Sequence, residues 1–143
     1  MGIGYRIDKA LGLTLVVWDG VISGDEAEDH VRGLFDDPDW PPGRMHLLDA
    51  TSVTSVPKLA NTKLVDLAVN AAETRRIRFA LVQQMGFDEA TYFEREASAR
   101  GLSQVIVFND IATACTWLGL EVGSIRATVA DMRRELREQS ETP

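Results

Sequence analysis

Near the start of the chain, apolar and polar residues alternate in the manner of a β-strand. Tyr5 and Ile7 alternate with polar neighbours, residues 9–12 have the composition of a turn, and an apolar run resumes at Leu13–Trp18. The pattern predicts an antiparallel hairpin over residues 4–22. Shorter apolar runs predict three further strands, at residues 45–49, 77–84 and 104–108. The apolar content of residues 77–84 indicates burial on both faces, as in a parallel sheet between helices.

Helical spacing separates these strands. The segment Ser23-Gly24-Asp25-Glu26 has the spacing of a capping box and predicts a helix whose apolar stripe is formed by Ala27, Val31, Leu34 and Phe35. The proline-rich loop over residues 36–43 must end this helix. Three more helices are expected, at residues 59–74, from Asp88 to a glycine cap at Gly101, and at 111–118.

The last predicted helix begins near Ser124 and carries one apolar seam, formed by Ile125, Val129, Met132 and Leu136. Such a seam either packs on the chain's own domain or meets a partner protein, including a second copy in a homodimer. We therefore divide the chain into a domain of residues 1–122 and a C-terminal amphipathic helix with a short tail, residues 123–143. The resulting order of elements, β-β-α-β-α-β-α-β-α-α, predicts an α/β fold with a mixed sheet of about five strands.

Composition narrows the class of protein. The 143 residues are 45% hydrophobic and 26% charged, which suits a single globular domain. No apolar run approaches the roughly 18 residues of a membrane span, and the first residues lack a secretory signal pattern, so a cytoplasmic location is expected. The net charge is −7, and residues 1–50 hold ten acidic against four basic residues. A field of this sign repels phosphate backbones, so we expect no nucleic acid partner.

Residues that could support catalysis or bind metal are sparse. Cys115 is the only cysteine, and the two histidines, His30 and His46, have no second histidine at ligand spacing. Neither a nucleophile elbow nor a glycine-rich phosphate loop occurs. We therefore expect no metal, no cofactor and no catalytic residues, and predict a non-enzymatic protein.

Polar residues follow three of the predicted strands at their carboxyl ends, where α/β proteins commonly bind ligands. The candidates are Asp49 and Thr51, then Gln83 and Gln84, then Asn109 and Asp110. The same side chains also suit structural roles, because Asp49 can fix a turn and Asn109 or Asp110 can cap a helix. In the proline-rich loop, Trp40 either forms a lid over such a site or packs in the core.

The end of the last predicted strand carries a family resemblance. Phe108-Asn109-Asp110, followed by Ala114, Trp117 and Leu118, resembles the recurring ending of SpoIIAA-like STAS domains, in particular the stand-alone bacterial members. The resemblance spans residues 4–120 and implies a SpoIIAA-like fold. STAS regulators of anti-sigma factors carry a phosphorylatable Asp-Ser-Ser-Gly-like turn after the third strand. Here the equivalent positions are residues 57–60, Pro-Lys-Leu-Ala, so no phosphorylation site is expected.

These observations favour a non-enzymatic regulatory or protein-interaction module, which presents the acidic first helix or the C-terminal helix to a partner. The alternative is a carrier of a small apolar or amphipathic, lipid-like ligand held between sheet and helices. A third class, an enzyme that uses Asp49 and Asp110 as acid and base, needs these two carboxylates within a few Å of each other.

Overall fold

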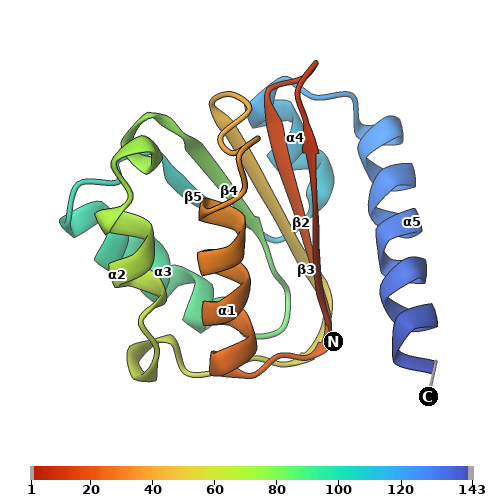
Figure 1. The fold of residues 1–143 in the computed structure, drawn as a ribbon, viewed down its shortest axis with the longest axis horizontal. Coiled ribbons are helices and arrows are strands. Elements are labelled where there is room, and N and C mark those ends of the chain that lie inside the picture. Colours follow the sequence, from red (N-terminus) through yellow and green to blue (C-terminus); the bar gives the residue numbers. More distant parts are fainter. Residues whose placement is uncertain (1, 142–143) are drawn as a thin grey trace.

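Five strands form one mixed sheet whose spatial order equals their order in the sequence, β1-β2-β3-β4-β5 (Figure 1). The computed structural model describes residues 2–141. β1 (Ile3–Asp8) and β2 (Leu13–Val21) are antiparallel, and β3 (Met45–Ser55), β4 (Arg78–Val82) and β5 (Val105–Phe108) continue the sheet parallel to β2. The predicted α/β class, the hairpin and the mixed five-stranded sheet are confirmed.

Helices cover both faces of this sheet. α1 (Gly24–Phe35), α2 (Leu64–Asn70) and α3 (Phe87–Ala99) connect successive parallel strands and lie together on one face (Figure 1). They share a face because three crossovers of the same hand step across the sheet in one direction. α4 (Ile111–Leu118) and α5 (Val122–Glu141) cover the other face. None of the helices within residues 2–141 has the length and apolar character needed to cross a membrane.

Alternate residues of the central strands enter two separate cores. On β2, Val16 and Trp18 face α1, α2 and α3, whereas Leu15 and Val17 face α4 and α5. Both Val16 and Val17 are completely buried. The continuous apolar runs of the sequence thus reflect strands that are covered on both faces.

The apolar seam of α5 packs on the chain's own sheet. The four side chains of the seam are only 3–6% exposed and share a core with residues of β2, β3 and β4. The seam consists of Ile125, Val129, Met132 and Leu136. Leu136 also lies over β1, where a Cβ added at Gly4 would be 3.4 Å from its Cδ2. The expectation that this seam binds a partner or a second copy is therefore corrected, because the sheet already occupies it. The division at residue 122 stays a prediction.

Several boundaries differ from those predicted. The expected helix at residues 59–74 is interrupted, and α2 is flanked by 3₁₀ turns at Leu59–Asn61 and Ala72–Arg76. The hydroxyl of Thr74 explains the break at its end, because it donates to two carbonyl oxygens of the preceding segment at 2.6 Å, those of Ala68 and Ala71. β3 continues to Ser55, where it still pairs with the last residue of β2.

Two helix starts also differ in detail. Ser23 caps α1 as predicted, since its hydroxyl accepts from the amide of Glu26 at 3.1 Å. The Glu26 carboxylate does not complete the capping box; it accepts from the Gly2 amide at 2.7 Å and so fixes the start of the chain. α3 is preceded by Gly86, whose φ of 75° lies in the left-handed region, and not by a cap at Asp88.

We expect the contact between α5 and the sheet to contribute much of the free energy of unfolding. Met132→Ala should lower it by about 2–5 kcal/mol, because a buried side chain is lost and a cavity remains. Ala130→Gln, at an exposed position of the same helix, should change it by no more than about 0.5 kcal/mol. Urea denaturation of both variants measures the difference, and equal effects would show that α5 does not pack as described.

Candidate functional site

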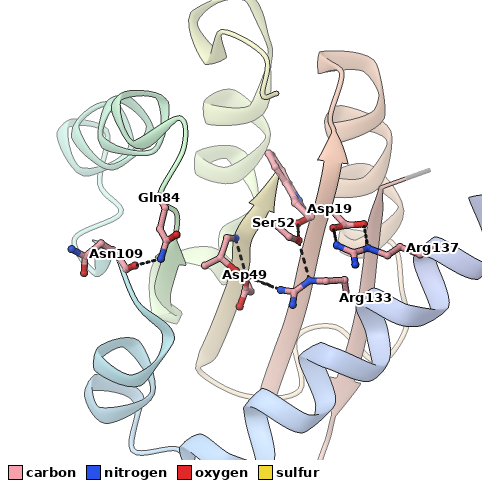
Figure 2. Close-up of polar contacts among 9 residues, drawn as sticks. Asp19, Asp49, Ser52, Gln84, Asn109, Arg133 and Arg137 are labelled. Atoms are coloured by element: carbon pink, nitrogen blue, oxygen red, sulfur yellow. Dashed lines mark hydrogen bonds and ion pairs between the residues drawn. The ribbon is translucent and has the colours of Figure 1, made fainter. Parts of the chain in front are cut away.

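Asp49 is a buried carboxylate near the carboxyl end of the sheet. It lies on the α5 side of β3 and is 3% exposed. Its Oδ1 accepts hydrogen bonds from the Thr51 amide at 2.9 Å and from the Thr51 hydroxyl at 2.7 Å. The Nη2 of Arg133, from α5, lies 3.5 Å from the same oxygen (Figure 2). The carboxylate therefore has compensating partners, as a buried charge requires.

A second acidic residue binds α5 one turn further along. The Nε and Nη2 of Arg137 donate to the two oxygens of Asp19 at 3.1 and 3.0 Å (Figure 2). Between the two pairs, the Nε of Arg133 donates to the Ser52 hydroxyl at 3.0 Å. We call these residues the α5 clamp: Asp19, Asp49, Thr51, Ser52, Arg133 and Arg137.

The clamp changes the acidity of Asp19. Burial alone would raise its pKa, but hydrogen bonds with Arg137 and Ser52 and the nearby charges of Arg137 and Arg133 outweigh burial, so the pKa is lowered. The ionised form is thus stabilised in the folded protein. Because α5 supplies both arginines, the clamp ties the end of β2 and β3 to the C-terminal helix.

The other predicted polar residues form a separate group. The Gln84 side-chain amide donates to the Asn109 carbonyl at 3.2 Å, which links the ends of β4 and β5 (Figure 2). Asp110 caps α4, because its Oδ1 accepts from the Thr113 amide at 2.8 Å. This backbone hydrogen bond, together with that from the Thr113 hydroxyl, lowers the pKa of Asp110. Asp49 and Thr51 thus belong to the α5 clamp, whereas Gln84, Asn109 and Asp110 make structural contacts of their own, and a shared ligand-binding rim stays a prediction.

Trp40 belongs to the core. It is 8% exposed and stacks on Phe35 of α1, with ring centroids 4.2 Å apart and planes at 25°. Its loop precedes β3, so it lies at the amino end of the parallel strands, opposite the predicted polar residues. Of the two alternatives for Trp40, packing is the one observed, and the assignment to a ligand site is corrected.

Sequence reasoning missed a cavity of about 90 Å³ between the sheet and α1, α2 and α3. Its walls are largely apolar, but Trp18, His30, His46 and Gln83 also line it. Of these residues, His30 belongs to α1. Its position three residues after Ala27 and four before Leu34 places it on the buried stripe, and this spacing could have located it.

The two histidines are held neutral. Burial lowers the pKa of His30 to about 4. Burial, with a smaller effect of the charge on His30, lowers the pKa of His46 to about 3. Their rings lie against aromatic neighbours, that of His46 being 4.8 Å from Phe79 between centroids. Within residues 2–141, no three or more His, Cys, Asp or Glu side chains come together to hold a metal ion.

The α5 clamp should show energetic coupling between its partners. Arg137→Gln should lower the free energy of unfolding at pH 7, and the loss should shrink in an Asp19→Asn background, giving a coupling of up to about 1 kcal/mol for this partly exposed pair. Folding lowers the pKa of Asp19, so the stabilisation by the Asp19–Arg137 pair is present at neutral pH. This stabilisation is lost as the pH falls through the folded pKa of Asp19. A coupling of zero at pH 7 would contradict the pairing.

The histidines predict a second pH dependence. Their folded pKa values lie below the unfolded value of about 6.5, so the unfolded chain binds more protons than the folded one below that pH. Stability should be complete well above pH 6.5 and should decline as the pH falls from 6.5 toward the folded pKa values of about 4 and 3, with uptake of about two protons on unfolding near pH 5. The variants His30→Gln and His46→Gln should each lower the number of protons taken up on unfolding by about one. This number follows from the slope of the free energy of unfolding against pH, measured by denaturation at several pH values. An unchanged slope in both variants would argue against buried neutral imidazoles.

Comparison with known proteins identifies the fold. No protein-family model matches the chain, and a search of curated proteins finds no match. Among solved structures, the chain is similar to an uncharacterised protein of the DUF3478 family with a SpoIIAA-like fold from Shewanella loihica PV-4. The two are 19% identical, with a TM-score of 0.54 over 82% of this chain and 93% of that one. Together with the topology described above, this similarity shows that the chain has a SpoIIAA-like fold.

Proposed function

We propose that this chain is a non-enzymatic regulatory module that binds a protein partner at the carboxyl-end edge of its sheet. The observation that carries the proposal is a group of exposed apolar side chains at that edge. Val21 ends β2 and is 70% exposed, while Met85 and Phe87 follow β4 and are 53% and 38% exposed. We call these three residues the carboxyl-end patch. Exposed apolar groups gathered in one place are typical of a binding surface.

Backbone contacts connect the parts of this patch. Val21 pairs with Ser55, the last residue of β3, and Val56 follows directly. A Cβ added at Gly86 would lie 2.6 Å from the Cγ2 of Val56, so the loop carrying Met85 and Phe87 rests on the end of β3. The loops after β2, β3 and β4 run along one edge of the molecule, the lower edge in Figure 1. A partner could therefore contact all three at once.

Acidic residues flank the carboxyl-end patch. Asp25 lies in the first turn of α1 and Asp88 in the first turn of α3, both exposed and both at this edge. We therefore expect the partner to present apolar side chains bordered by basic ones, since complementary charge speeds association and selects among partners. This surface includes the start of the acidic helix expected from the sequence, whereas the seam of α5 is occupied. A cytoplasmic location remains part of the proposal.

The engagement of the candidate carboxylates supports a non-enzymatic role. Asp49 bonds to Thr51 and lies beside Arg133, and Asp110 caps α4, so each has its own structural partners. A general acid needs a pKa raised toward neutral pH, but that of Asp110 is lowered. The acid and base pair considered from the sequence is not proposed further.

The lipid-carrier alternative fails on size. A ligand of that kind needs an apolar pocket of roughly 300 Å³ or more. The cavity between the sheet and α1, α2 and α3 measures about 90 Å³. We therefore do not propose that the chain carries a lipid-like molecule.

Site-specific photo-crosslinking tests the partner surface. A photoreactive phenylalanine analogue placed at Met85 should give a discrete adduct with one protein in cells of the source organism. The same group at Leu11 is the matched control, because Leu11 is 48% exposed but lies in the turn between β1 and β2 at the other end of the sheet. Adducts at both positions, or at neither, would contradict a partner site at the carboxyl-end patch.

A further inference from the structure

The two outer strands of the sheet, β1 and β5, are protected from further pairing to different degrees. β5 has four residues, and the amide of its Val107 donates to the Glu94 carboxylate of α3 at 2.8 Å. β1 has six residues, contains no proline and pairs with β2 in a regular register. Its single cation, Arg6, is paired with Glu135 at 2.6 Å. β1 therefore lacks the devices by which proteins usually keep a free strand edge from pairing.

The backbone groups of β1 alternate between β2 and the open edge. The Gly2 carbonyl accepts from the Asp19 amide at 2.7 Å, and the antiparallel register continues from this pair. Every second residue from Gly2 onward therefore exchanges hydrogen bonds with β2. The residues between them are Ile3, Tyr5 and Ile7, and these direct their amides and carbonyls away from β2. Each of the three thus offers one donor and one acceptor at the outer edge of the sheet.

A second copy of β1 has the spacing that this edge requires. In an antiparallel pair centred on Tyr5, Ile3 of each copy lies opposite Ile7 of the other, and all the outward amides and carbonyls are paired. A register moved by two residues would leave Ile3 or Ile7 opposite a residue outside β1. The move that pairs Tyr5 with Ile7 also places Arg6 opposite Arg6, and like charges in that position are destabilising. The edge therefore favours the register centred on Tyr5.

The α1 side of this strand pair is apolar in both copies. Ile3, Tyr5 and Ile7 are partly buried against the core on this side of the sheet. In the register centred on Tyr5, each of them would gain an apolar or aromatic neighbour across the new pair. Cross-strand pairs of these types stabilise a sheet. The contact would therefore extend a row of side chains that one copy leaves incomplete.

The α5 side offers complementary charge. Arg6 of one copy lies opposite Gly4 of the other, and Gly4 has no side chain to obstruct it. A hollow of about 170 Å³ lies beside Gly4 between β1 and α5, and Glu135 forms part of its wall. The Arg6 and Glu135 side chains are 44% and 52% exposed, so both are accessible. A two-fold contact uses the same patch on both subunits, and a patch that holds both signs of charge meets this condition.

Helix α5 leaves this edge of the sheet open. Its Arg133 reaches Asp49 on β3, and its Arg137 reaches Asp19 on β2 (Figure 2). The helix therefore lies over the face of the sheet and does not stand beside β1. A strand can approach β1 in the plane of the sheet without displacing α5.

We propose that the outer edge of β1 is a dimer interface, at which two copies of the chain pair antiparallel about Tyr5 and Arg6 of each copy contacts Glu135 of the other. The two five-stranded sheets then become one continuous sheet. The interface consists of one strand pair and its flanking side chains, so the dimer should be reversible. No residue of the carboxyl-end patch belongs to β1, so this inference and the proposed partner site stand or fail separately.

Sedimentation equilibrium of the full chain tests the dimer. The mass should rise to twice that of one chain within a range from about 1 μM to about 1 mM protein. Arg6→Glu places like charges together in each of the two ion-pair networks and should raise the dimer dissociation constant about tenfold. Adding Glu135→Arg to this variant should restore the original value. Arg100→Glu is the matched control, because Arg100 pairs with Asp66 at 2.6 Å and is 42% exposed but lies at the end of α3.

Hydrogen exchange of single amides, followed by NMR, tests the register. The amides of Ile3, Tyr5 and Ile7 should exchange at least about tenfold more slowly in the dimer than in the monomer. Those of Gly4 and Arg6 bond to β2 in both states and should change less.

Three results would overturn the proposal. The first is a monomer over the whole concentration range, and the second is a dimer in which the outward amides of β1 are not protected. The third is protection of these amides only when a different protein is added, which would assign the edge to that protein and not to a second copy.

Discussion

The structure depends on the burial of the central strands from both sides. Neighbouring residues of β2 point in opposite directions, yet Val16 and Val17 are both fully covered. A sheet with two apolar faces requires two helical layers, because either face left open would expose a large apolar surface to water. α1, α2 and α3 follow directly from the crossovers between parallel strands. The second face depends on α4 and α5, so the C-terminal helix is part of the core.

The position of α5 also decides the chemistry at the carboxyl end of the sheet. Its apolar seam fixes the helix along β1 and β2, and this places Arg133 and Arg137 over the strand ends. The acidic residues there, Asp19 and Asp49, are then engaged by cations of the chain itself. Polar residues that would be free to bind a ligand in a sheet without this helix serve to hold it. The apolar side chains of Val21, Met85 and Phe87 remain exposed at this edge.

The two helical layers differ in the side chains that they bury. The α4 and α5 layer buries mainly aliphatic side chains, whereas the α1, α2 and α3 layer leaves a cavity whose lining includes His46 and Trp18. Polar atoms without partners destabilise a core, and proteins commonly accept such a cost where a site has a function. The neutral histidines fit this environment, because a low dielectric favours the uncharged imidazole.

The sequence by itself determined the fold class, the order of the elements and the apolar faces, because strand and helix periodicities are local properties of the chain. It also located the cap at Ser23 and offered Asn109 or Asp110 as the cap of α4; the caps observed, Ser23 and Asp110, depend on residues three positions away. The tertiary structure decided which residues meet. It placed Trp40 in the core and turned Asp49 toward Arg133, which lies 84 positions later. Contacts of this kind depend on the register of distant strands and on the docking of α5, and these are set by packing between elements, which no local pattern encodes.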